Sequence, residues 1–301
     1  MRVAVTGANG LLGRQVIMAL EANQHTPIAL THRQFDITDF SATCAAIAHS
    51  TPDLVIHCAA MTHVDRCALE PDTALHINGY GTHNVALACR TIDIPIAYIS
   101  SNEVFDGSRA APYLEYDQTT PANPYGYSKW AGEQAIRDVQ PRHYIIRTSW
   151  LFAHGGDNFL HKLVRMAAQG TPISVVTNEV AAPTYANDLA EAVIALIGTE
   201  RYGIYHLVNE GHASRYQFAR HILDVAGCAH VPIAPILDVQ RPRPSHPPVY
   251  STLRNFAAAR LGITLRPWQE AVQMFFTREA ALTRATVAEP ERVAQAAAPT
   301  P

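Results

Sequence analysis

The stretch R-V-A-V-T-G-A-N-G-L-L-G, residues 2–13, decides the fold of this chain. It is typical of a short apolar strand that passes through a glycine turn into a helix. Gly7, Gly10 and Gly13 permit a tight turn in which backbone N–H groups approach a pyrophosphate, and a helix N-terminus adds partial positive charge. The spacing G-x-x-G-x-x-G differs from the G-x-G-x-x-G fingerprint, so the alternative is a loop that needs glycine only for positive φ. Its place between a strand and a helix favours dinucleotide binding.

Strand and helix patterns alternate along the first half of the chain. Apolar, β-branched runs separated by helical patterns predict a parallel sheet that helices cover on both faces. We therefore expect a doubly wound α/β fold of the Rossmann type, with ligands beyond the carboxyl ends of the strands. The predicted strands are Arg2–Thr6, Pro27–Thr31, Leu54–His57, Ile94–Ser100 and His143–Thr148, and the predicted helices are Leu11–Glu21, Phe40–His49, Thr73–Ile92 and Pro124–Val139.

Shorter elements after residue 150 predict a smaller C-terminal lobe that binds substrate. We expect residues 1–150 to form the dinucleotide-binding domain, with some later segments returning to it, and residues 151–278 to form mainly the lobe. Residues 232–248 are rich in proline and cannot join a regular ladder. Residues 279–301 predict a flexible tail, with a frayed helix as the alternative. The lobe's predicted helices are Asn158–Gln169, Ala186–Ile197, Arg215–Ala226, Phe256–Leu261 and Trp268–Phe276, and its strands are Pro172–Val176 and Gly203–Val208.

Composition excludes several classes of function. The net charge is −3 and no Lys/Arg-rich run is present, so we expect no nucleic-acid partner. No apolar run approaches the roughly 18 residues that span a bilayer, and the N-terminus lacks the apolar core of a signal peptide. Five cysteines without C-x-x-C spacing and scattered histidines predict reduced thiols, no metal site and a cytoplasmic location.

The run P-Y-G-Y-S-K, residues 124–129, carries a candidate acid. The chain has only two lysines, Lys129 and Lys162. Lys129 follows Tyr125 by four residues, so a helix places the ammonium beside the phenol. A nearby positive charge lowers a tyrosine pKa, which makes Tyr125 a candidate general acid. Because most i,i+4 pairs are plain surface contacts, the spacing alone is weak evidence.

Two serines add a hydroxyl to this pair. Ser100 and Ser101 end the predicted fourth strand, so they emerge at the carboxyl edge of the sheet. A hydroxyl polarises a carbonyl, a phenol protonates the resulting alkoxide, and an ammonium biases the phenol. Ser101, Tyr125 and Lys129 therefore predict reduction of a carbonyl by hydride transfer. The alternative is three unrelated residues in an ordinary α/β domain.

The end of the second strand indicates which dinucleotide is bound. An acid there suits the ribose hydroxyls of NAD, whereas an arginine suits a 2′-phosphate. The run A-L-T-H-R has no acid and ends at Arg33, so we expect NADP(H), with NAD(H) as the alternative. Arg33 could instead be a solvated loop charge. Arg14 is a second candidate partner for a phosphate.

Further motifs carry a resemblance to a known family. C-A-A-M-T-H-V-D (residues 58–65), R-T-S-W-L-F (147–152) and A-P-T-Y-A-N-D-L-A (182–190) accompany the glycine turn and the Tyr-x-x-x-Lys run. From Met1 to about Phe276 the chain resembles the extended short-chain dehydrogenases/reductases, and among them the dTDP-4-dehydrorhamnose reductase family. The resemblance implies that Ser101, Tyr125 and Lys129 are catalytic and that Lys129 also binds the nicotinamide ribose.

The resemblance also implies binding roles. Gly7, Gly10, Leu11, Leu12 and Gly13 would form the pyrophosphate loop; Asp36 and Ile37 would contact adenine; Ala59, Ala60 and Thr62 would line the cofactor; Asn78 would order the active-site lysine and its water; Val64, Asp65 and Trp150 would approach the sugar. Asn102 and Glu103 replace an Asp-Tyr pair of the family near the sugar, and Met61 stands where the family often has Tyr. Trp150 could instead be a core aromatic.

The resemblance implies an NADPH-dependent reductase of a 4-keto-6-deoxy sugar nucleotide. The reaction it favours converts dTDP-4-dehydro-L-rhamnose to dTDP-L-rhamnose for cell-surface polysaccharides. One alternative is a sugar-nucleotide epimerase or dehydratase, although Asn102 cannot donate a carboxyl proton. Another is a non-catalytic nucleotide-binding regulatory subunit. The expected partner is a nucleotide sugar, and a homodimer is compatible with the chain.

Overall fold

A computed structural model describes residues 1–155 and 158–296 of the chain. Its centre is a six-stranded sheet in the order β10-β5-β4-β3-β1-β2, and every neighbouring pair is parallel. The winding reverses between β1 and β3, which is where such sheets open a crevice for ligands. The predicted doubly wound fold is confirmed. The strands are β1 (Arg2–Thr6), β2 (Thr26–Leu30), β3 (Leu54–His57), β4 (Ile96–Ser101), β5 (His143–Thr148) and β10 (Gly203–His206).

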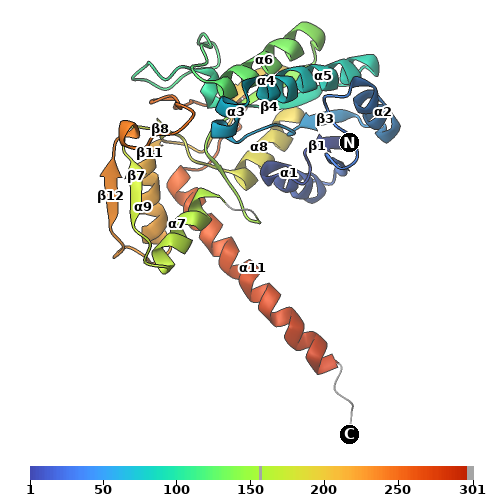
Figure 1. The fold of residues 1–301 in the computed structure, drawn as a ribbon. Coiled ribbons are helices and arrows are strands. Elements are labelled where there is room, and N and C mark those ends of the chain that lie inside the picture. Colours follow the sequence, from blue (N-terminus) through green and yellow to red (C-terminus); the bar gives the residue numbers. More distant parts are fainter. Residues whose placement is uncertain (156–157, 297–301) are drawn as a thin grey trace.

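Helices cover both faces of this sheet (Figure 1) because alternate residues of each strand point to opposite sides. Val3 and Val5 of β1 belong to the hydrophobic core that includes α1 and α8. Ala4, between them, belongs to the core that includes α2, α5 and α6. Both faces are therefore apolar, as a parallel sheet requires. The helices are α1 (Leu11–Ala22), α2 (Phe40–Ser50), α5 (Thr82–Thr91), α6 (Pro124–Val139) and α8 (Ala186–Ile197).

A smaller lobe has its own core, built around Phe152, Phe218 and Phe275. In Figure 1 it lies beside the sheet, and α8 and β10 return from it to complete the larger half. The remaining strands are β6 (Leu151–Phe152), β7 (Ile173–Val176), β8 (Val180–Ala181), β9 (Thr184–Tyr185), β11 (Ala213–Ser214) and β12 (Ile233–Ile236), and the helices are α7 (Phe159–Ala168), α9 (Arg215–Val225), α10 (Phe256–Ala259), α11 (Trp268–Ala296) and the 3₁₀ turn η3 (Asp238–Gln240).

The long helix predicted over Thr73–Ile92 is interrupted. The structure has α3 (Val64–Leu69), α4 (Pro71–Leu75), a π-helical turn η1 (His76–Gly81) and then α5. Single π turns inside α-helices are rare and frequently mark functional sites. Here the turn carries Asn78, which is fully buried.

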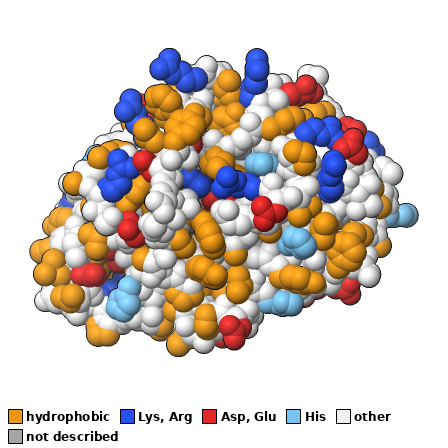
Figure 2. All heavy atoms as spheres, turned by 90° about the horizontal axis from the view of Figure 1, so that it is seen from above, with side chains coloured by type: hydrophobic (Ala, Val, Ile, Leu, Met, Phe, Trp, Pro, Cys, Tyr) orange, Lys and Arg blue, Asp and Glu red, His pale blue; other side chains and the backbone are white. Residues whose placement is uncertain are grey.

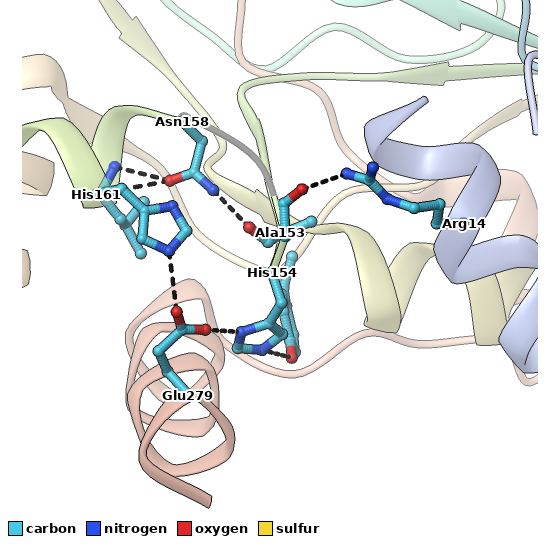
Figure 3. Close-up of polar contacts among 9 residues, drawn as sticks. Arg14, Ala153, His154, Asn158, His161 and Glu279 are labelled. Atoms are coloured by element: carbon cyan, nitrogen blue, oxygen red, sulfur yellow. Dashed lines mark hydrogen bonds and ion pairs between the residues drawn. The ribbon is translucent and has the colours of Figure 1, made fainter. Parts of the chain in front are cut away.

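The last helix is longer than predicted. The sequence predicts a tail from residue 279, whereas α11 continues to Ala296. Figure 3 shows Glu279 between two histidines of the lobe: its carboxylate pairs with His154 and, at 3.2 Å, with His161. Residue 279 therefore belongs to the folded structure, and an alanine-rich sequence favours the helix beyond it. In Figure 1 this helix extends away from the body.

The surface carries mixed side chains. On the face seen in Figure 2, hydrophobic, basic and acidic side chains are interspersed. Among the described helices, none combines the length and the hydropathy that crossing a membrane demands.

Candidate active site

A cavity of about 1180 Å³ lies along the carboxyl ends of the central strands. It runs from the glycine turn after β1 to the lobe residues Trp150 and Arg215, so both halves of the chain form its wall. Two of the predicted site residues, Asn78 and Asp65, do not line it. The predicted residues that do are Gly7, Gly10, Leu11, Leu12, Gly13, Arg33, Asp36, Ile37, Ala59, Ala60, Thr62, Val64, Ser101, Asn102, Glu103, Tyr125, Lys129 and Trp150.

The glycine turn fits a pyrophosphate. Gly7 has a φ of +65°, and a Cβ there would lie 2.8 Å from the Ala59 backbone. A Cβ on Gly13 would lie 2.2 Å from the Gly7 carbonyl oxygen. Helix α1 begins after Gly10 without a side-chain cap and without an acid in its first turn. Its first N–H groups and their partial positive charge are therefore left for an anionic ligand.

The loop after β2 presents basic and polar groups to the same cavity. Arg33 is exposed and lines the cavity together with His32. Asp36 also lines it, but its carboxylate accepts hydrogen bonds from the Thr38 N–H and hydroxyl, at 2.9 and 2.8 Å. The Thr38 backbone hydrogen bond holds the pKa of Asp36 below its usual value. The acid of this loop that lines the cavity is thus occupied locally, which leaves Arg33 available for a phosphate.

The start of α6 places Tyr125 beside Ser101. Asn123 caps the helix by accepting the Gly126 N–H at 2.8 Å. A Cβ on Gly126 would lie 1.9 Å from the Glu103 carbonyl oxygen, so the helix packs directly against the backbone after β4. The Ser101 hydroxyl lies close enough to the Tyr125 phenol to lower its pKa. The structure therefore brings the predicted hydroxyl and the predicted acid together.

The predicted shift of the Tyr125 pKa is wrong in direction. Burial raises the pKa of Tyr125, the negative charge of Glu103 raises it further, and the Ser101 hydroxyl only partly opposes them. Lys129 is not among the groups that shift this pKa in the resting structure, and its Nζ lies over the ring of Tyr98, 4.2 Å from the centroid. Tyr125 therefore stays protonated around neutral pH, as a proton donor must.

Lys129 is buried and electrostatically balanced. Burial lowers its pKa to about 7, and Glu133, one turn further along α6, opposes the shift. Glu133 is itself held by two buried partners: Arg147 at 2.7 Å and the Ser100 hydroxyl at 2.5 Å. The sequence prediction paired Lys129 with Tyr125 but did not foresee this acid–arginine pair beneath it.

Asn78 supports the site from behind. Its side-chain oxygen accepts the Met61 N–H at 2.7 Å, and its amide donates to the Met61 carbonyl and the Ser128 hydroxyl, each at 2.9 Å. Ser128 in turn donates to the Tyr125 carbonyl at 2.8 Å. The resemblance implied that Asn78 orders Lys129 and its water, which stays a prediction; in the structure the Asn78 side chain fixes the loop after β3 and the first turn of α6.

The proline-rich segment and the residues just after it contact two of the predicted substrate-binding residues. Asp65 accepts from the Arg243 guanidinium at 2.8 Å and the Ser245 N–H at 3.3 Å, which turns it away from the cavity. Asn102 donates to the Ser251 hydroxyl at 2.6 Å and accepts from Ser101 at 3.3 Å.

Glu103 is a half-buried acid near Tyr125. It accepts a hydrogen bond from the Asn123 amide at 2.7 Å, and burial raises its pKa.

Trp150 and Arg215 form the lobe's part of the wall. Trp150 has a φ of +41°, a strained conformation for a residue with a side chain. The Arg215 guanidinium lies 3.6 Å from the Trp150 ring centroid and pairs with Glu179 at 3.4 Å. Trp150 also stacks on Phe218 of the lobe core, so it is both a packing and a cavity residue. Sequence reasoning missed Arg215, because no spacing relates it to the other site residues.

A parallel sheet with a glycine turn after β1 and a serine–tyrosine–lysine set at β4 and α6 defines a short-chain dehydrogenase/reductase. Comparison with known proteins narrows this class. The family model described as RmlD substrate binding domain matches residues 1–281. The chain belongs to the dTDP-4-dehydrorhamnose reductase family.

Relatives agree over nearly the whole chain. It is 39% identical to a dTDP-4-dehydrorhamnose reductase of Mycolicibacterium smegmatis, covering 90% of this chain and 84% of the relative. It is 37% identical to the spore coat polysaccharide biosynthesis protein SpsK of Bacillus subtilis, covering 91% and 96%. A dTDP-4-dehydrorhamnose reductase of Bacillus anthracis, solved in complex with NADP, matches with a TM-score of 0.89 and 35% identity, covering 92% of this chain and 99% of that one.

A more distant structure shares the fold alone. A UDP-glucose 4-epimerase of Thermus thermophilus matches with a TM-score of 0.79 at 21% identity, covering 91% and 97%. That likeness gives no support to the epimerase alternative.

Proposed function

We propose that this protein is an NADPH-dependent reductase that converts dTDP-4-dehydro-L-rhamnose to dTDP-L-rhamnose. The observation that carries the proposal is that Ser101, Tyr125 and Lys129 line one cavity together with the glycine turn. The printed names of the relatives support the substrate, and the NADP-bound relative supports the cofactor. The five free cysteines suit a reducing compartment such as the cytoplasm.

Each group of residues in the cavity has its own role in the proposed reaction. The backbone around Gly7, Gly10 and Gly13 would hold the pyrophosphate, and Arg33 would hold the 2′-phosphate. The bound reduced cofactor supplies the hydride. Ser101 donates a hydrogen bond to the substrate carbonyl oxygen, which stabilises the negative charge that develops there. Tyr125 gives its phenolic proton to that oxygen, and the charge of Lys129 stabilises the phenolate left behind.

The raised pKa of Tyr125 suits this direction of reaction. A reductase needs the phenol protonated before the chemical step, and burial together with Glu103 keeps it so. The dehydratase alternative needs an acid next to the catalytic hydroxyl. Position 102 instead holds an amide that is bonded to Ser101 and Ser251. The geometry therefore favours reduction.

The test follows the loss of NADPH absorbance with dTDP-4-dehydro-L-rhamnose. Tyr125→Phe should lower kcat by about 10²–10⁴, the usual contribution of a positioned acid, while NADPH binding persists. Tyr127→Phe is the matched control, because Tyr127 lies on the same helix and is exposed. Absence of turnover by the unaltered protein with every 4-keto sugar nucleotide tried would overturn the proposal.

A further inference from the structure

The ammonium of Lys129 rests on an aromatic face. Its Nζ lies 4.2 Å from the centroid of the Tyr98 ring, well within the range of a cation–π interaction. Within residues 1–155 and 158–296, no group accepts a hydrogen bond from this Nζ, although the lysine is only 3% exposed. The ring is therefore a direct contact of a buried positive charge.

Tyr98 is held rigidly in the middle of the sheet. It is fully buried in β4, and its hydroxyl donates to the Lys129 carbonyl at 3.3 Å. His57 of the neighbouring strand stacks on it at 5.6 Å, and His57 is fixed between Thr6 at 2.6 Å and Thr82 at 3.1 Å. The ring thus contacts Lys129 twice, through its face and through its hydroxyl, from a position that cannot easily shift.

Gly132 keeps α6 in register with this ring. A Cβ on Gly132 would lie 2.5 Å from the Tyr98 hydroxyl oxygen and 2.7 Å from the Asn78 carbonyl oxygen. Gly132 follows Lys129 by three residues, on the same side of the helix. The absence of a side chain there lets the helix approach Tyr98 closely enough for the ammonium to reach the ring.

We propose that Tyr98 is a positioning residue of the active site, whose ring face holds the Lys129 ammonium charged and in place. A π face attracts a cation without consuming an N–H group. The three N–H groups of Lys129 therefore stay available for ligands in the cavity and for the charge that forms on Tyr125. The activity readout below depends on the proposed reductase function, whereas the spectroscopic readout does not.

Other titratable groups near Lys129 affect whether its ammonium is charged. Glu133 on α6 favours its charged form, and burial opposes it. The nearby thiols of Cys58 and Cys67 stay protonated in this range, because burial raises their pKa values to about 12 and about 11. Burial and the Lys129 charge lower the pKa of His57 to about 3, so the imidazole stays neutral and does not repel the ammonium. Because burial dominates, the lysine depends on each favourable contact it has, the ring among them.

The two lysines of the chain make a direct test possible. Lysine labelled with ¹³C at Cε gives one resonance for Lys129 and one for Lys162 on α7, and the Lys162→Arg variant assigns them. We expect the Lys129 resonance to carry a ring-current shift and to titrate well below the usual range of a lysine. In Tyr98→Leu the ring-current shift should vanish and the titration midpoint should fall by about 0.5–1 pH unit, from the usual strength of a cation–π contact. Lys162 should not change.

The matched variant is Tyr98→Phe, which keeps the ring and removes the hydroxyl. It should retain the ring-current shift and the titration midpoint. If Tyr98→Phe loses as much as Tyr98→Leu, the hydroxyl and not the ring positions Lys129, and the proposal is wrong. It is equally wrong if Tyr98→Leu leaves the Lys129 resonance unchanged. Should the leucine variant fail to fold, phenylalanines with increasing fluorination at position 98 weaken the π face at almost constant size, and the midpoint should fall stepwise with fluorine content.

Activity gives a second readout. If charged Lys129 is required, the alkaline limb of kcat/KM should move to lower pH in Tyr98→Leu by the same amount, and kcat should fall more than NADPH affinity does. Tyr98→Phe should keep the wild-type profile. If the unaltered protein shows no turnover in this assay, the proposed function is refuted. The lysine resonances would still decide whether Tyr98 positions Lys129.

Discussion

The buried charge of Lys129 should be visible in the stability of the protein. Its pKa falls from 10.5 to about 7 on folding, because burial outweighs Glu133. Between these two values the unfolded chain binds more protons than the folded one, so the free energy of unfolding rises with pH. The folded group is half charged near pH 7 and neutral near pH 9. Integration over this window gives a rise of about 2 kcal/mol.

The measurement is urea unfolding at a series of pH values from 7 to 9. Other groups also titrate there, so the informative quantity is the difference from the Lys129→Met variant, which keeps an unbranched apolar side chain. We expect the free energy of unfolding of the wild-type protein, minus that of Lys129→Met, to rise by about 2 kcal/mol between pH 7 and pH 9. Lys162→Met is the matched control, because Lys162 is exposed on α7 and should leave the wild-type slope intact.

The window ends at pH 9 for a physical reason. Burial raises the pKa of Cys58 to about 12, so above pH 9 the unfolded thiol ionises while the folded one does not, and stability falls. If Lys129→Met shows the same slope as the wild-type protein between pH 7 and 9, Lys129 is charged throughout and its burial does not shift it. The reasoning about its environment would then be wrong.

Three further predictions concern the cavity. Glu103→Gln removes a negative charge that raises the pKa of Tyr125. Titration of the phenolate absorbance in the ultraviolet should therefore show Tyr125 ionising at a lower pH than in the wild-type protein. An unchanged titration would show that Glu103 does not act on Tyr125. Arg33→Asp should reduce the preference for NADPH over NADH by roughly 10- to 100-fold, the usual strength of hydrogen bonds to charged groups; an unchanged ratio of kcat/KM values would place Arg33 outside the site. Gly13→Ala should abolish NADPH binding measured by calorimetry, because its Cβ would lie 2.2 Å from the Gly7 carbonyl oxygen; near-normal affinity would contradict that contact.

The parts of the fold that follow from local pattern were predictable. The conformations of the turn around Gly7 and of strand β1 are determined by the local sequence. The predicted bounds of β1, β3, β5 and α6 match the structure. The π turn at His76–Gly81 was not predictable, because its reason is tertiary: it turns the side chain of Asn78 inward to bond the Met61 backbone. A helical period cannot reveal a partner 17 residues away.

The pKa shifts in the site were harder to predict than the residues that form it. The four-residue spacing correctly placed Tyr125 and Lys129 in one cavity. It could not show which neighbouring side chain the Lys129 ammonium would contact. The ammonium contacts Tyr98, which lies 31 residues earlier in the chain and belongs to a different element. Desolvation depends on how much protein covers a group, a quantity that no short motif contains. The direction of the Tyr125 shift was therefore wrong although the residue was right.

Asn102 shows how a departure from the family pattern can still serve the site. An acid at this position would carry a negative charge next to Ser101 and would need a proton to donate to Ser251. The amide does both tasks without charge: it accepts from the Ser101 hydroxyl and donates to the Ser251 hydroxyl. It thus ties the end of β4 to the segment that carries Ser251. With Glu103 already raising the pKa of Tyr125, a second carboxylate here would make the phenolate formed during reduction still less stable. A neutral residue at position 102 is therefore compatible with reduction in a way that a second acid beside Glu103 would not be.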